Sequence, residues 1–442
     1  MESISNDTKS NNINIDNFFE VSKVIIYSII GIVIFFIPIS IDNQTKTILN
    51  HMAYRLQINY GDILKICTVI YIILGVTKSI LSKNKSSIQI IYSYLKVFSI
   101  FIVISLFYSK YSIVLLDDNI AFILEEMILN LITALPLSAV FLPFILDFGL
   151  LEIVEGFTNK FMKKLFNLSG KTILNILMYL FNNCFCGYFM TELLYEKGKI
   201  RQKEACIIIL NFSIASISVS TYIAEELKIN KVNFFILSVF ILFLTNLILC
   251  RIYPINKKKK SYYIKTSYKE TNFKNDKLKS SIKKYVQNKE DINIFKSMFG
   301  NLEKSIHILI TVIPNLVLVM YLGNIIINNM DAIYNLKVVF LRILEFLNFN
   351  NINEMGIFFI NGLFNDVVAI DTLNTNIDYT SRLLIGVICI LKCTSITTNI
   401  LYVGNSEIPV NKVDFLVSYI QRIVVILLIS SMIFYLYNIY TI

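Results

Sequence analysis

Long apolar stretches, separated by shorter polar segments, run from residue 24 to the end of the chain. A helix needs about 20 apolar residues to span a bilayer, and most of these stretches approach that length. The pattern predicts about nine spanning helices, at residues 24–40, 63–81, 97–108, 128–146, 205–225, 234–251, 306–327, 383–403 and 415–437. We therefore expect an all-α, polytopic membrane protein whose main partner is the lipid bilayer.

The amino-acid composition supports the same class of protein. Of the 442 residues, 55% are hydrophobic and 16% are charged, whereas soluble domains carry about 25% charged residues. Because no soluble core could bury this much apolar surface, the bilayer must cover part of it. The chain has 25 Tyr and no Trp, so the aromatic belt at the membrane interfaces must rely on Tyr.

The reactive side chains form no recognisable catalytic or metal-binding pattern. The two histidines, His51 and His307, lie far apart in the sequence and lack clustered carboxylates. Seven scattered cysteines do not make a disulfide framework and favour small buried hydrophobes. No glycine loop of the phosphate-binding kind is present. We expect no enzyme activity, no metal site and no cofactor.

The basic segment at residues 251–296 sets the orientation of the chain. It carries fourteen Lys and Arg residues and four acids, and its net charge of +10 equals that of the whole chain. A polybasic loop beside membrane helices belongs on the cytoplasmic side. This topology explains the charge without nucleic-acid binding, which we do not expect, and it is compatible with binding of anionic lipid. Polar residues 1–23 then form a disordered cytoplasmic tail of a plasma-membrane protein.

Two further basic clusters indicate a re-entrant hairpin. Lys163 and Lys171 precede the apolar segment at residues 172–194, and Lys197 and Lys199 follow it. If that segment crossed the membrane, one cluster would face outwards. A hairpin that enters and leaves on the same side removes the conflict. The polar run at its centre, residues 182–187, is a poor mid-bilayer helix, and such backbone needs cover from protein or a cavity.

The second half of the chain repeats the order of the first. An amphipathic helix at residues 149–167 precedes the hairpin and the span at 205–225, and another at 335–348 precedes a broken segment at 356–373 and the span at 383–403. One unit enters from the cytoplasm and the other from outside, which predicts an inverted-topology repeat. The alternative is that helical membrane proteins look alike at this level of detail. The expected regions are the tail 1–23, helices 24–127, a first repeat 128–251, the basic loop 252–297 and a second repeat 298–442.

Several short sequence motifs resemble those of a known family. FGLLE at residues 148–152, Leu168-Ser169-Gly170, and GYFMTELLYEKGK at residues 187–199 resemble the YjiH-like proteins of the nucleoside-recognition, or Gate, domain superfamily. In the second half, FND at 364–366 and SEIPV at 406–410 are similar to the family's motifs, and Arg422 falls where its last helix carries an arginine. The resemblance covers about residue 128 to the end and implies two Gate-like repeats.

The resemblance implies a transport-type membrane protein. Relatives of the domain include gating regions of ferrous-iron transporters, nucleoside transporters and certain spore-maturation proteins. The chain departs from the pattern at Thr397 and Thr398, where the family tends to have Ser-Glu, and at Ala369 and Ile370, where a proline is expected. These differences bear on whether the chain keeps the family's ligand.

Polar residues in and after the two broken segments are the candidates for solute binding, because amide oxygens and freed backbone groups can coordinate a polar solute or a cation. They are Asn182, Asn183 and Thr191 in the first segment, Asn361, Asn365 and Asp366 in the second, and Ser213, Ser216, Thr397 and Thr398 in the helices that follow. The alternative is that they satisfy the broken backbone or pack helices together.

Two finer expectations concern charge and periodicity. Ser213, Ser216 and Ser220 recur every three or four residues and are expected to share one helix face. Lys392 lies within a predicted span and needs a partner or an aqueous cavity. We expect Asp366 to be that partner.

Three functions remain open on this reading. The first is a secondary transporter or permease for a small polar solute or ion, a nucleoside-like ligand being one option. The second is a non-transporting membrane assembly or scaffold protein, related to spore-maturation Gate proteins. The third, an intramembrane enzyme, has the least support. The sequence leaves the substrate, the coupling ion and the oligomeric state open.

Overall fold

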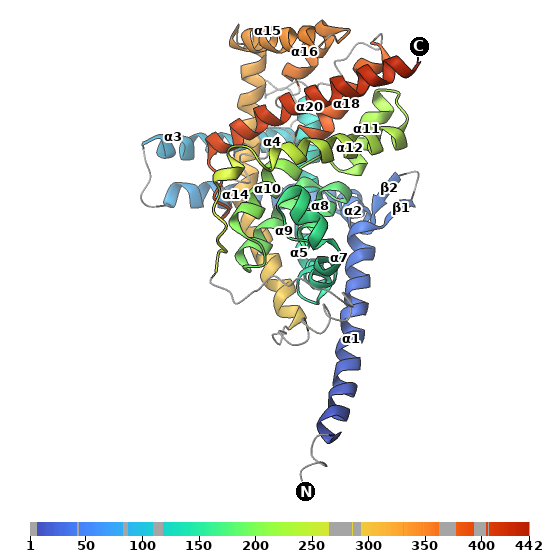
Figure 1. Cartoon of the computed structure of the whole chain (residues 1–442). Coiled ribbons are helices and arrows are strands. Elements are labelled where there is room, and N and C mark those ends of the chain that lie inside the picture. Colours follow the sequence, from blue (N-terminus) through green and yellow to red (C-terminus); the bar gives the residue numbers. More distant parts are fainter. Residues whose placement is uncertain are drawn as a thin grey trace.

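Helices make up nearly all of the described chain, and two strands form one small hairpin. The computed structural model describes residues 7–41, 44–82, 87–108, 118–264, 285, 293–329, 331–347, 349–361, 377–392, 404 and 406–441. In Figure 1, α1 extends away from the body towards the amino terminus, and α15 and α16 lie at the opposite end together with the carboxyl terminus. The chain is an all-α polytopic membrane protein.

The elements before the basic loop are α1 (Asp7–Phe36), β1 (Pro38–Ile41), β2 (Gln44–Thr47), α2 (Ile48–Leu81), α3 (Ser87–Leu95), α4 (Val97–Tyr108), α5 (Asp118–Phe141), α6 (Pro143–Leu146), α7 (Leu150–Phe166), α8 (Thr172–Phe181), α9 (Cys184–Glu196), α10 (Gln202–Ile207), the π-helix η1 (Ile208–Phe212), α11 (Ile217–Glu226) and α12 (Lys231–Leu249). The later ones are the 3-10 turn η2 (Ile255–Lys257), α14 (Ile294–Asn329), α15 (Asp331–Phe346), α16 (Ile352–Asn361), α18 (Tyr379–Leu391) and α20 (Lys412–Thr441).

Seven helical segments of the described residues are long and apolar enough to cross a membrane. They are α2, residues 90–108 in α3 and α4, residues 124–141 in α5, residues 202–226 in α10 to α11, α12, residues 294–323 in α14, and residues 412–435 in α20. The predicted spans at residues 24–40 and 383–403 correspond to shorter apolar helices, at residues 21–36 and in α18. The span at 24–40 ends early because Pro38 begins a strand.

The amino-terminal region differs from the sequence prediction of a disordered tail. Residues 7–23 are helical and continuous with the apolar part of α1. No Gly or Pro stands between Asp7 and Ile30, so no local signal ends the helix before the apolar stretch. The tail and the first apolar segment are one helix.

Three long helices, α2, α5 and α14, pack against one another and form the support for the rest of the fold. The closest approach is at Gly75, where a Cβ atom would overlap the Ile310 carbonyl oxygen and lie 2.7 Å from Pro314. Small residues permit such contact between membrane helices. Pro314 lies inside α14, where its ring removes one backbone hydrogen bond.

The predicted amphipathic helix at residues 149–167 is α7, but its two faces are arranged as in a membrane protein. The polar face, with Glu152, Glu155 and Asn159, is buried against the protein. Phe157 and Phe161, on the apolar face, are half exposed. Lys160 and Lys164 are exposed on the same face, so this face is mixed: the phenylalanine rings can contact lipid while the lysine side chains reach towards water or headgroups.

The second unit is described only in part. The amphipathic helix predicted at 335–348 is α15, the broken segment predicted at 356–373 begins with α16, and the span predicted at 383–403 begins with α18. Asn365, Asp366, Thr397 and Thr398 lie outside the described residues. The inverted repeat therefore remains a prediction.

Candidate functional site

The predicted hairpin consists of two short antiparallel helices that separate at Asn182 and Asn183. Helix α8 has 10 residues and α9 has 13, so they reach about 15 and 20 Å, less than the roughly 30 Å of hydrocarbon in a bilayer. The rings of Tyr179 and Tyr188 meet edge to face, with centroids 5.5 Å apart. Neither helix is long enough to cross, as a re-entrant hairpin requires.

Both asparagines at the hairpin tip bond to the protein. The Asn182 amide donates to the Phe35 carbonyl at 2.8 Å, and its oxygen accepts from the Thr47 hydroxyl at 3.0 Å. Asn183 caps α9 by accepting from the Cys186 amide at 2.8 Å. The Asn183 bond satisfies a backbone amide that the break leaves open, and the Asn182 bonds join the tip to the end of α1 and the start of α2.

Thr191 lies between the two hairpin helices. Its hydroxyl donates to the Gly187 carbonyl at 2.7 Å and accepts from the Asn175 amide at 2.7 Å. The side chain is fully buried. As with Asn182 and Asn183, its role in binding a solute stays a prediction, and the contacts present are internal to the hairpin.

Several of the motifs that carry the family resemblance lie together at the base of this hairpin. The Glu204 carboxylate accepts from the Ser169 amide at 2.5 Å and from the Arg201 amide at 2.8 Å, which joins the turn before α8 to the start of α10. The Asn159 oxygen accepts from the Gly170 amide at 3.2 Å. A Cβ atom at Gly170 would lie 2.5 Å from the Asn159 backbone nitrogen, so only glycine fits there.

Buried charged side chains also lie at the base of the hairpin. The Lys171 ammonium lies 4.0 Å from the Glu155 carboxylate, and both side chains are almost fully buried. Burial lowers the pKa of Lys171, although Glu155 and Glu152 act in the opposite direction. Burial also lowers the pKa of Lys197, whose ammonium lies 2.7 Å from the Asp147 carboxylate. Lys171 and Lys197 lie at the same end of the hairpin, in agreement with the predicted same-side entry and exit.

The helix after the hairpin is broken where the sequence predicted a continuous one. Helix α10 passes into the π-helix η1, residues 213–216 are extended, and α11 begins at Ile217. The expectation that Ser213, Ser216 and Ser220 share one helix face is therefore wrong, because the first two lie in non-helical backbone. The Ser213 hydroxyl donates to the Ile209 carbonyl at 2.7 Å, and the Ser216 side chain does not cap α11.

This break contacts the end of α18, the corresponding span of the second unit. The Ala215 amide donates to the Ile390 carbonyl at 3.1 Å. Helix α18 ends at Leu391, one residue later, and is followed by the cap residue Lys392, whose side chain is 1% exposed. The Lys392 ammonium lies 5.8 Å from the centre of the Phe358 ring in α16. Whether Asp366 pairs with Lys392 lies outside the described residues.

Two polar residues beside the break were not among the predicted site residues. Arg422 of α20 is 1% exposed and donates to the Leu210 carbonyl of η1 at 3.3 Å. Asn246 of α12 is fully buried, and neither atom of its amide has a hydrogen-bond partner in the described part of the chain. Buried polar groups in membrane spans are costly and mark functional regions. Their positions within apolar helices were visible in the sequence, but their proximity to the break was not.

Comparison with known proteins agrees with this architecture. Residues 128–230, from the middle of α5 to the last residue before α12, match the Gate family, described as nucleoside recognition. The matched region includes the hairpin, its polar base and the broken helix. A protein of Alkalihalophilus pseudofirmus, described as uncharacterized, is 30% identical over 128 residues, which is 28% of each chain. No solved structure matches the chain.

Proposed function

We propose that this Gate-domain protein is a secondary transporter or permease for a small polar solute or ion, nucleosides being one class to test. The proposed location is the plasma membrane, with the amino terminus in the cytoplasm. The observation that carries the proposal is the unwound segment at residues 213–216 inside an apolar span. Discontinuous membrane helices of this kind expose backbone groups that can bind a solute near the middle of a bilayer.

The surroundings of the break support a binding role over a merely structural one. The span that contains it is the most buried of the seven, with 72% of its apolar window inside the protein, against 22% for α2. Its polar backbone therefore faces protein or a cavity instead of lipid. The buried Lys392 and Arg422 lie beside it, on two other helices. Unwound backbone beside buried cations favours solute binding over a scaffold role.

Transport is tested with purified protein in liposomes, by measuring uptake of radiolabelled uridine and adenosine. The critical variant is Ser213→Ala, with Ser238→Ala as its matched control. Both hydroxyls are buried and donate to the carbonyl four residues earlier, at 2.7 and 2.8 Å. Ser238 lies in the continuous helix α12.

If the break binds the solute, Ser213→Ala lowers uptake by about tenfold, the effect of losing about 1.4 kcal/mol of binding, and Ser238→Ala leaves it unchanged. Equal losses in both variants would mean that the hydroxyls only stabilise the fold. Wild-type uptake no greater than in empty liposomes, together with no thermal stabilisation by either nucleoside, would contradict the nucleoside class and favour a scaffold role.

A further inference from the structure

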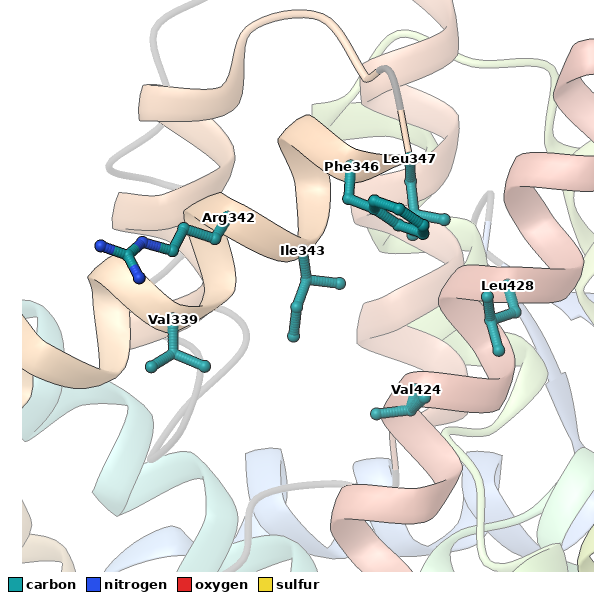
Figure 2. Close-up of a pocket in the computed structure, with 7 residues that line it drawn as sticks. All are labelled: Val339, Arg342, Ile343, Phe346, Leu347, Val424 and Leu428. Carbon is teal, nitrogen blue, oxygen red and sulfur yellow. The ribbon is translucent and has the colours of Figure 1, made fainter.

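A groove lies between α15 and α20, which are both outside the region that matches the Gate family. It has a volume of about 370 Å³ and is lined by Val339, Arg342, Ile343, Phe346, Leu347, Val424 and Leu428. Figure 2 shows the apolar side chains around the gap between the two helices, with the guanidinium of Arg342 extending away from it at one edge. The groove is thus apolar along its length and cationic at one rim.

The apolar walls are open to the surroundings. Phe346 is 84% exposed and Val339 is 58% exposed on α15, while Leu428 is 45% exposed on α20. Helix α20 is one of the candidate spans, so the face that carries Val424 and Leu428 meets hydrocarbon. An apolar groove on such a face holds a chain of methylene groups at no cost in dehydration.

The charged residues at the rim of the groove indicate which kind of ligand it can bind. Beside the groove, between residues 337 and 345, α15 carries Lys337, Arg342 and Glu345, a local excess of one positive charge, while Asp331 lies at the start of the helix, about three turns before Arg342. A guanidinium binds phosphate oxygens through two parallel hydrogen bonds. An acyl chain in the groove and a phosphate at Arg342 are the two parts of one molecule, a phospholipid.

We propose that the groove between α15 and α20 is a binding site for an anionic phospholipid, with an acyl chain along Phe346, Val424 and Leu428 and the headgroup phosphate on Arg342. The cationic rim favours a phosphate-bearing lipid over a second copy of the chain, because a copy would place the same Arg342 near its counterpart without supplying a phosphate.

The absence of Trp from the sequence makes a direct test straightforward. The variant Phe346→Trp places a single indole at the groove, at a position that is mostly exposed and where the change keeps an aromatic ring. Leu416→Trp is the matched control: it is 48% exposed on the same helix α20, about 12 Å along the axis from Val424. Each protein is reconstituted in bilayers that contain acyl-brominated phosphatidylglycerol or acyl-brominated phosphatidylcholine, and quenching of the indole fluorescence is compared.

The indole of the Phe346→Trp protein should be quenched at least twofold more by the brominated anionic lipid, and that of the Leu416→Trp protein equally by both lipids. Adding Arg342→Gln to Phe346→Trp should abolish the preference, while quenching by phosphatidylcholine remains.

Equal quenching of the groove indole by both lipids would overturn the proposal. So would a preference for the anionic lipid in the Leu416→Trp protein, whose indole lies near the Lys258–Asp414 pair of the basic loop. Protection of the groove indole from both lipids in a dimeric protein would show instead that a second copy covers the groove.

Discussion

The region that matches the Gate family, residues 128–230, contains two interruptions of helical backbone that are held in different ways. At the hairpin tip, the amide of Asn182 reaches the end of α1 and the start of α2 through two side-chain hydrogen bonds. At residues 213–216, a backbone hydrogen bond from the Ala215 amide to the Ile390 carbonyl links the break to helix α18. The first break is closed by the residues that cause it, and the second is held in part by a helix far away in the sequence.

The difference separates a structural turn from a site that can respond to a ligand. A buried amide that bonds two other elements fixes the tip in one position, since losing either bond leaves a buried polar group unsatisfied. A backbone bond between two segments that are distant in sequence, such as that from Ala215 to Ile390, can be exchanged for one to a solute without leaving a buried side-chain amide unsatisfied. The following predictions measure this contrast as losses in the free energy of unfolding.

The largest loss is expected for Asn182→Ala. The substitution leaves the Phe35 carbonyl without this donor and the Thr47 hydroxyl without its acceptor in a buried region, at about 1–3 kcal/mol each, so we expect a loss of about 2–6 kcal/mol. Denaturant or thermal unfolding in detergent measures it. Asn230→Ala is the control, an exposed cap of α12 that should cost about 1 kcal/mol. Equal losses would show that the tip is no more firmly held than an ordinary helix cap.

A smaller loss is expected for Glu204→Gln, at the start of the broken helix. Its carboxylate accepts two backbone hydrogen bonds, and the amide would offer an N–H to one of these donors. We expect a loss of about 1–2 kcal/mol, because bonds to charged acceptors are the stronger ones. Glu225→Gln, in an exposed pair with Lys231, should cost less than about 1 kcal/mol. No difference between them would mean that the broken helix is not anchored at its base.

The two breaks also differ in how far the sequence could predict them. The hairpin break was predictable, because consecutive asparagines interrupt an apolar run and same-side lysines flank it. The break at residues 213–216 was not. Its residues, Ser213, Ile214, Ala215 and Ser216, include no Gly or Pro, and its bond to Ile390 joins two segments far apart in the sequence. Tertiary contact overrides local propensity there.

The same limit applies to the faces of α7. Periodicity gave the two faces of the helix correctly, yet it could not say that Glu155 is buried and Phe157 exposed. That choice is made by the solvent around the helix, since lipid reverses the usual preference. At Arg422 the family resemblance pointed to an arginine in the last helix but gave no contact for it. The structure shows that its guanidinium donates a hydrogen bond to the Leu210 carbonyl.

The smallest effect concerns the start of α18, the helix that meets the second break. Asp378 caps it and accepts from the Ser381 amide. Burial alone would raise the pKa of Asp378, but hydrogen bonds from Ser381, Thr380 and Asn351 outweigh it, and the pKa is lowered. A carboxyl group with a lowered pKa stabilises the folded state above its ordinary pKa, and that stability is lost as the pH falls through the lowered value.

The wild-type protein should therefore lose stability between about pH 5 and pH 3 in part through Asp378. Asp378→Asn keeps a cap but cannot titrate, so its melting temperature should fall less over the same interval, and Ser381→Ala should lie between the two. Melting curves at closely spaced pH values measure the slopes. Because α18 supplies the Ile390 carbonyl to the second break, protonation of Asp378 should also weaken solute binding there before it affects the hairpin tip. If the three slopes coincide, the cap does not control the stability of α18, and the second break is held by some other part of the second unit.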